Sequence, residues 1–211
     1  MKHYPIFLDL HHKPVLVIGG GDMALEKIIN LRKSGARITV IAPNILPQIR
    51  RFSANVTCVE RDFVLSDISL DFILVFAATG DEALNEQVST YCSGLRILCN
   101  TVDEPRWCHF ISPAILRRGA MTIAISTAGV SPSLAQSVRQ IIAEAIPARY
   151  VQLTRFLAMF SPEVRSSIPT VEDRKLFWQY FYRQNPYLLL SQYGLGTLRD
   201  RARDWLRSFG G

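Results

Sequence analysis

The sequence predicts an α/β fold in which a doubly wound parallel sheet is followed by a small α/β region and a helical C-terminal domain. Short apolar segments of strand length alternate with segments in which apolar residues recur at helical spacing. A run of three glycines directly follows the first apolar segment. Apolar strands separated by helices are typical of a parallel sheet that helices cover on both faces.

The expected elements of the sheet follow one another along the first half of the chain. Ala24, Ile28 and Leu31 lie at helical spacing, and Gly35 stands where a glycine commonly ends a helix. The predicted strands are residues 14–18, 37–41, 56–59, 72–76 and 97–99, and the predicted helices are residues 23–33 and 82–91.

The second half is expected to contain one more strand and several helices. Ser131 is a favourable N-cap followed by Pro132 at the first helical position, and Thr170 is a favourable start for an aromatic helix. The predicted elements are a strand at 123–126, the helix after Ser131, a helix at 151–160 that stops at Ser161-Pro162, an aromatic helix over 176–182 that ends before Asn185-Pro186, and a helix at 198–209 capped by Thr197.

Length and composition indicate a globular protein. The 211 residues are 48% hydrophobic, which is ample for a core. No apolar run approaches the roughly 18 residues that span a bilayer, and Asp9 interrupts the short apolar N-terminal segment. We therefore expect a cytoplasmic protein that does not span a membrane. The four cysteines lack CxxC spacing, so we expect reduced thiols and no metal site.

The net charge of +6 is compatible with several anionic partners. Residues 150–211 carry nine Lys and Arg against five Asp and Glu. These charges are interleaved, as in LRDRARDW, so a solvated helix face explains them at least as well as a nucleic-acid groove. We expect no nucleic-acid partner.

The glycines predict a dinucleotide site. Gly19, Gly21 and Ala24 fit the pattern G-x-G-x-x-A between a predicted strand and helix. The first glycine allows the turn, the second lets the backbone approach a pyrophosphate, and the small Ala24 permits close packing of the helix on the sheet. Free amides at the helix start, at Asp22 and Met23, then bind the phosphates. A tight structural turn is the alternative interpretation.

One element of the usual dinucleotide pattern is absent. The second strand leads into Ala42, Pro43 and Asn44, without the Asp or Glu that normally binds the ribose hydroxyls. We expect backbone groups or Asn44 to hold the ribose. These residues leave the choice between NAD and NADP open, and Arg37 is interpreted as an exposed residue at the start of a strand.

The segment Cys99-Asn-Thr-Val-Asp-Glu-Pro-Arg106 follows the last predicted strand, and ligands bind at such carboxyl ends in open α/β sheets. Asp103 is the strongest candidate for a group that does chemistry there, although a turn aspartate before Pro105 is the structural alternative. At the same edge we predict Thr79 as a cofactor ligand and Asn100 as a substrate ligand.

A second candidate anion site follows the strand at 123–126. Thr127 and Gly129 lie in a loop that leads to the helix capped by Ser131. We predict both as substrate-binding residues. An ordinary cap, with Gly129 making the turn, explains the same residues equally well.

Several motifs occur in one order between residues 4 and 149: YPIFLDL, VLVIGGGDMALEK, NTVDEP, CHFISPAI, AISTAGVSPSLAQSVR and IPAR. In this order they resemble the family of precorrin-2 dehydrogenases, which includes the N-terminal half of siroheme synthase and the bifunctional dehydrogenase/ferrochelatase. The C-terminal 60 residues match only loosely, so their function rests on analogy.

The resemblance implies a Rossmann domain that binds NAD at residues 1–111, a dimerisation region at 112–148 and a helical domain at 149–211, assembled as a homodimer. It implies oxidation of precorrin-2 to sirohydrochlorin, and in some members insertion of Fe2+ to give siroheme. Asp103 falls on the family's proposed catalytic aspartate. Thr127 falls where some members have a phosphorylated serine, and the change to Thr puts that regulation in doubt.

The residues suit such a substrate, because a tetrapyrrole carries many carboxylates that arginines can bind. Arg117 is the predicted ligand among the arginines near the candidate site, which are Arg106, Arg117, Arg118, Arg139 and Arg149. His109 is a further candidate base for metal insertion, although a packed or surface histidine is the commoner case. Two alternatives stay open, a regulatory domain that senses NAD or binds a tetrapyrrole without turnover, and a nucleic-acid-binding protein.

Overall fold

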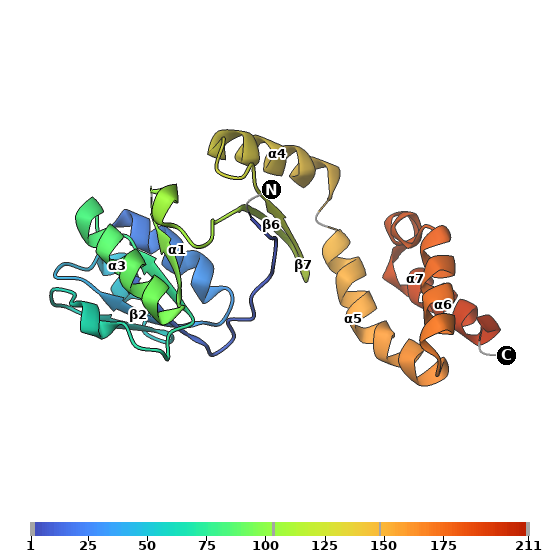
Figure 1. Ribbon diagram of the computed structural model, residues 1–211. Coiled ribbons are helices and arrows are strands. Elements are labelled where there is room, and N and C mark those ends of the chain that lie inside the picture. Colours follow the sequence, from blue (N-terminus) through green and yellow to red (C-terminus); the bar gives the residue numbers. More distant parts are fainter. Residues whose placement is uncertain (1–2, 103, 148, 210–211) are drawn as a thin grey trace. The chain divides into compact units, whose positions relative to one another are not determined.

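The computed structural model describes residues 3–102, 104–147 and 149–209, and the chain divides into two compact units, Met1–Ser112 and Pro113–Gly211. Each unit is built separately around its own hydrophobic clusters. Figure 1 shows the first unit as a sheet with helices and the second as a small hairpin followed by helices.

The first unit contains a five-stranded parallel sheet of order β3-β2-β1-β4-β5. The chain moves outward from β1 to β3 and then crosses to the other side of β1, which makes a doubly wound sheet with a switch point between β1 and β4. The strands are β1 (Pro14–Ile18), β2 (Arg37–Ile41), β3 (Val56–Val59), β4 (Leu74–Ala77) and β5 (Leu98–Thr101). The helices are α1 (Asp22–Arg32), α2 (Pro47–Arg50), α3 (Glu82–Leu95) and the 3-10 turns η1 (Leu65–Asp67) and η2 (Pro105–Trp107).

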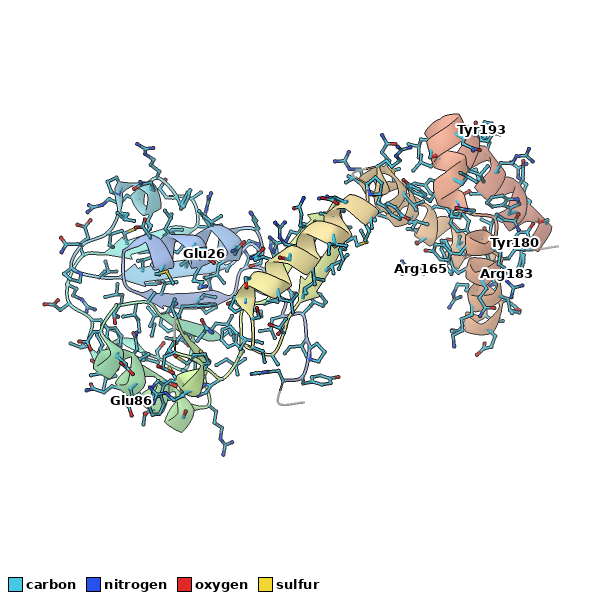
Figure 2. The ribbon with its side chains drawn as sticks, turned by 90° about the horizontal axis from the view of Figure 1, so that it is seen from above. Glu26, Glu86, Arg165, Tyr180, Arg183 and Tyr193 are labelled. Atoms are coloured by element: carbon cyan, nitrogen blue, oxygen red, sulfur yellow. The ribbon has the colours of Figure 1, made fainter. Side chains whose placement is uncertain are left out.

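The two faces of this sheet carry separate clusters. Alternate residues of β1 point to opposite faces, so Val15 and Val17 pack with Ile28 of α1, whereas Leu16 and Ile18 pack with Val88 of α3. Figure 2 labels Glu26 on α1 and Glu86 on α3, the helices that cover these two faces. Continuous apolar strands buried on both sides confirm the predicted doubly wound fold.

Some predicted boundaries were wrong. The strand expected at 72–76 is Leu74–Ala77, and the helix expected at 82–91 continues to Leu95. It continues because Cys92 is buried against the sheet, and it ends where Arg96 adopts a left-handed conformation, with φ 59°.

The second unit begins with a β-hairpin and a helix. Strand β6 (Ala114–Arg118), which the sequence pattern did not predict, pairs antiparallel with β7 (Met121–Ile125), and Gly119 turns between them with φ 61°. Helix α4 (Pro132–Ala145) packs on both strands. Arg118 donates hydrogen bonds to the carbonyl oxygens of Ala143 and Ile146, both at 3.2 Å, and so caps the end of α4.

Three longer helices complete the second unit: α5 (Tyr150–Ser167), α6 (Val171–Arg183) and α7 (Pro186–Phe209). The predicted stop at Ser161-Pro162 was wrong, because α5 runs through Pro162. An interior proline costs about 3 kcal/mol, but each buried apolar residue beyond it, such as Val164 and Ile168, contributes about 1.5–3 kcal/mol. Ser161 also donates to the carbonyl oxygen of Leu157 at 2.7 Å.

The last helix also differs from the prediction. Helix α7 begins at Pro186 rather than after Thr197, and Gly194, with φ 82° and ψ 177°, breaks it into two helical parts. The aromatic helix α6 is confirmed: it starts after Thr170, whose hydroxyl accepts from the Asp173 N–H at 3.1 Å, and ends before Asn185. In the described parts of the chain, we find no helix that is both long and apolar enough to cross a membrane.

Candidate functional site

The glycine loop lies at the carboxyl end of β1, at the switch point of the sheet. Gly19 has a φ of 116°, and a Cβ there would stand 2.1 Å from the carbonyl oxygen of Ala78, just after β4. A Cβ on Gly20 would stand 2.2 Å from the carbonyl oxygen of Asn44, in the loop after β2. Side chains are therefore excluded at both positions because the loops after β2 and β4 close on this turn.

Gly21 is different from its two neighbours. A Cβ built there meets nothing within 4 Å, and the residue is the N-cap of α1, with φ −86°. The first amides of a helix have no intrahelical acceptor, and here they start at Asp22 and Met23, whose side chains are exposed. Ala24 is fully buried, which lets α1 pack closely on the sheet. The open face of the turn thus presents backbone donors, with room for a phosphate group.

The loop after β2 places the predicted ribose ligands beside this turn. Ala42 is buried, whereas Pro43 and Asn44 are exposed. Since the Asn44 carbonyl faces Gly20, the Asn44 side chain and the nearby backbone are the groups left for a ribose. Arg37 lies at the amino end of β2, the opposite edge of the sheet, and donates to the carbonyl oxygen of His12 at 3.0 Å. That position supports its interpretation as an exposed strand residue.

Thr79 follows β4 at the same edge, but its hydroxyl is engaged within the protein. Its Oγ1 lies 2.8 Å from Asn85 Oδ1 and accepts from the Asp81 N–H at 3.1 Å. Asp81 in turn caps α3 by accepting from the Leu84 N–H. This network shapes the loop. Because the hydroxyl is already engaged, a contact between Thr79 and a cofactor would be made by the Thr79 backbone.

The segment after β5 is held tightly on both sides of Asp103, which itself lies outside the described residues. Val102 donates to the carbonyl oxygen of Ala77 at 2.9 Å, and Thr101 Oγ1 donates to the carbonyl oxygen of Glu104 at 2.8 Å. The Val102 contact fixes the carboxyl end of β5 next to that of β4.

Arg106 is paired with acids rather than left for a substrate. Its guanidinium contacts Glu104 at 2.9 Å and Glu82 at 3.1 Å. The hydrogen bond from Arg106 lowers the pKa of the Glu104 carboxyl below its usual value. The sequence pattern did not predict this cluster, because Glu82 comes from α3 and meets the segment only in the folded chain.

Asn100 is buried in β5, and its amide donates to the carbonyl oxygen of Phe110 at 2.8 Å. This contact ties the segment after η2 to the sheet. The buried position favours a structural role, and substrate binding by Asn100 stays a prediction without a contact to support it.

His109 is packed against the edge strand β5. Its Nδ1 accepts from the Cys99 N–H at 3.1 Å, and its Nε2 lies 2.8 Å from the hydroxyl of Ser93, which donates to the Ser89 carbonyl. Its Nδ1 also lies 3.2 Å from the carbonyl oxygen of Ile97. Both nitrogens are used inside the fold, which favours the structural interpretation of this histidine.

His109→Ala is therefore expected to lower the free energy of unfolding by about 1–3 kcal/mol, because it leaves a strand N–H without its acceptor. Urea unfolding measures this change. Ser93→Ala removes only the Nε2 partner and should cost less. Equal stability of His109→Ala and the parent chain would show that the ring is not a structural element.

Two of the four cysteines are buried within the fold. All four are free, and Cys92 and Cys99 are buried side by side between α3 and β5. The hydrogen bond with Cys92, together with burial, raises the pKa of Cys99, so its thiol stays protonated. Among the described residues, no group of three or more His, Cys, Asp or Glu could hold a metal ion.

The remaining predicted ligands belong to the second unit. The Thr127 hydroxyl donates to the Ser131 carbonyl at 2.9 Å and accepts from the Ser131 N–H at 3.0 Å. Gly129 turns the loop with φ 87°, and the Ser131 side chain caps α4 by accepting from the Leu134 N–H. These contacts favour the ordinary cap over an anion site. Arg117 is exposed on β6, whereas Arg118 caps α4.

Two family models match the chain. One, described as "Putative NAD(P)-binding", matches residues 6–114, and another, described as "Sirohaem biosynthesis protein central", matches residues 118–145. The siroheme synthase of Thioalkalivibrio sulfidiphilus is 38% identical over 181 residues, which are 85% of this chain and 37% of that protein. The siroheme synthase of Zymomonas mobilis is 35% identical over 182 residues, 85% of this chain and 38% of that protein.

The chain therefore spans less than two fifths of the length of these relatives. Among solved structures, "SirC, precorrin-2 dehydrogenase" superposes with a TM-score of 0.73 at 24% identity and covers 98% of both chains, which shows a shared fold. These matches confirm the resemblance seen in the sequence motifs. Because the first family model covers more than half of the chain, including the glycine loop and all five strands of the sheet, the chain belongs to this NAD(P)-binding family.

Proposed function

We propose that this protein oxidises precorrin-2 to sirohydrochlorin, with NAD as the hydride acceptor. The observation that carries the proposal is the open glycine turn at the switch point of the sheet, where Gly21 leaves room for a phosphate. The adjoining match to the sirohaem biosynthesis model, and relatives named siroheme synthase, support the substrate. The structural neighbour named precorrin-2 dehydrogenase has the same fold.

The residues at the turn fit a dinucleotide. Gly19 and Gly20 hold the turn against the loops after β4 and β2, and Gly21 with the amides of Asp22 and Met23 would bind the pyrophosphate. Backbone groups of residues 42–44 would bind the ribose. When bound, NAD supplies a hydride acceptor, and the protein's part is to orient the macrocycle and to remove a proton.

Asp103 is the proposed proton acceptor. Its neighbours Val102 and Glu104 are fixed at the carboxyl end of β5, the edge at which open α/β sheets bind ligands. Arg117, Thr127 and Gly129 are the proposed contacts to the tetrapyrrole and its carboxylates. Arg117 is exposed, whereas Arg106 and Arg118 already have partners within the fold, which makes Arg117 the better candidate of these three.

Anaerobic incubation with precorrin-2 and NAD tests the proposal, with the absorption spectrum of sirohydrochlorin as the readout. Product formation that requires NAD is the expected result. NAD binding without any product would instead support a regulatory domain that senses the cofactor. Iron insertion, the second activity that the resemblance implies, remains a prediction, and adding Fe2+ to the same reaction tests it. The cytoplasmic location is likewise part of the proposal, and cell fractionation tests it.

We also propose that residues 112–148 form a homodimer interface. Helix α4 and its preceding loop expose large apolar side chains, with Val130, Leu134 and Ile141 at 85%, 54% and 64% exposure. Such a surface is typical of an interface between subunits. The three-domain division, with residues 1–111 for the cofactor and 149–211 as a helical domain, is part of the same proposal.

Ile141→Glu is expected to shift the protein from dimer to monomer, because it places a charge in the proposed apolar interface. Sedimentation velocity at micromolar concentration measures the change. Gln136→Glu is the matched control, since it adds the same charge on another face of α4 and keeps the acceptor for Arg139. A parent chain that sediments as a fully active monomer would rule the interface out.

A further inference from the structure

A cavity of about 550 Å³ lies between α5 and α6 in the second unit. Its volume is within the range of small-molecule sites. Three cationic side chains, Arg165, Arg174 and Lys175, line it together with the aromatic rings of Trp178 and Tyr182. Among the described residues that line the cavity, none is acidic.

The charges of this cavity are not neutralised within the described part of the chain. None of its three cations forms an ion pair there, whereas Arg203 on α7 pairs with Glu163 at 3.1 Å. The nearby Asp173 is engaged with Thr170, whose hydroxyl donates to it at 2.7 Å at the start of α6. Three cations and no acid among the described lining residues favour an anionic ligand.

The cations are presented from two elements. Arg165 extends from α5 (Figure 2), and Arg174 and Lys175 extend from the first turns of α6. The Arg174 guanidinium donates to the carbonyl oxygens of Ile168 and Pro169 at 2.8 and 2.6 Å. These bonds fix the position of Arg174 before any ligand arrives, so its binding geometry is preorganised.

The aromatic side chains add a preference for a flat ligand. Trp178 packs edge-on against Phe177 and Phe181 of the core, at 5.3 and 5.4 Å between ring centroids, which holds the indole in place at the cavity. Tyr182 lies beside it at 6.2 Å. Partial burial raises the pKa of Tyr182, and its hydroxyl can donate a hydrogen bond. Aromatic rings and arginines together suit a conjugated plane with anionic groups at its rim.

We propose that this cavity is a second binding site for a tetrapyrrole, which stacks near Trp178 and places carboxylates against Arg165, Arg174 and Lys175. The inference rests on the proposed function for the identity of the ligand. Its residues all come from α5 and α6, and none of them belongs to the glycine loop or to the proposed substrate contacts Arg117, Thr127 and Gly129.

Uroporphyrin, a stable planar tetrapyrrole with carboxylates at its rim, is the probe. We would titrate it against the full chain and measure the affinity and the number of binding sites by calorimetry. The test variant is Arg165→Gln/Lys175→Gln, whose positions are exposed. The control is Arg183→Gln/Arg201→Gln, which removes the same charge from exposed positions outside the cavity lining. Figure 2 labels Arg183 on α6.

The test variant should lose roughly tenfold or more in affinity for one class of site, with the control unchanged. Equal binding by the test variant and the parent chain would overturn the proposal. Displacement of uroporphyrin by millimolar phosphate alone would overturn it too, since that result indicates a simple anion site. Measuring precorrin-2 oxidation in the same protein separates the proposed function from the proposed binding site. If the protein binds uroporphyrin through Arg165 and Lys175 but does not oxidise precorrin-2, the proposed function is wrong and the binding site stands.

Discussion

Gly21→Asp is expected to abolish NAD binding and leave the first unit folded. A Cβ at this position meets nothing within 4 Å, and the φ of −86° suits any residue, so the fold tolerates the side chain. The added carboxylate would stand where the pyrophosphate must lie and repel it, which we expect to weaken NAD affinity by roughly a hundredfold or more. Isothermal titration with NAD measures the loss.

Two further variants serve as controls for this result. Gly94→Asp adds the same side chain in α3, where a Cβ also meets no atom within 4 Å, and it should bind NAD like the parent chain. Gly20→Asp should instead disturb the fold, because its Cβ would collide with the Asn44 carbonyl. Unchanged NAD affinity in a folded Gly21→Asp variant would rule out a dinucleotide site at this loop.

Asp103→Ala is expected to reduce precorrin-2 oxidation by roughly 10²- to 10⁴-fold, the range typical of a lost general base, with NAD affinity nearly intact. Asn at this position should be almost as poor, since it keeps the shape of Asp but cannot take a proton. Rates measured at saturating NAD, together with NAD titrations, check both parts of this expectation.

The Asp103→Asn variant separates chemistry from structure. If the residue only shapes the turn before Pro105, Asn should retain activity because its side chain forms the same turn hydrogen bonds, and Ala should lose stability. Near-parental oxidation by Asp103→Asn would therefore contradict the catalytic assignment. Orientation of the ring against the nicotinamide would then be the better explanation of rate.

The sequence predicted the parts of the fold that depend on local pattern. Apolar strands, the glycine turn and the caps at Ser131 and Thr170 are all readable from neighbouring residues, and they occur as expected. Pro162 was misinterpreted because its local signal ends a helix, whereas burial of Val164 and Ile168 against the other helices outweighs that signal. Strand β6 was missed because it is defined mainly by its pairing with β7, a contact that is seen only in the folded chain.

In the candidate site, too, some features follow from the local sequence pattern and others depend on contacts between distant segments. The open position of Gly21 follows from the G-x-G-x-x-A pattern, but the need for glycine at position 20 depends on the Asn44 carbonyl, which a later loop brings close. Likewise, only the folded chain shows that Glu82 reaches Arg106 and that His109 serves the edge strand. Contacts between distant segments have no signature in a single sequence.

We propose that the chain transfers a hydride from precorrin-2 to NAD bound at the glycine loop. The most direct measurement is the ratio of NADH to sirohydrochlorin formed in one anaerobic reaction, with the Gly21→Asp variant alongside. We expect equal amounts of the two products from the parent chain and neither from the variant. Sirohydrochlorin formed without NADH, or by the variant at the parental rate, would contradict it.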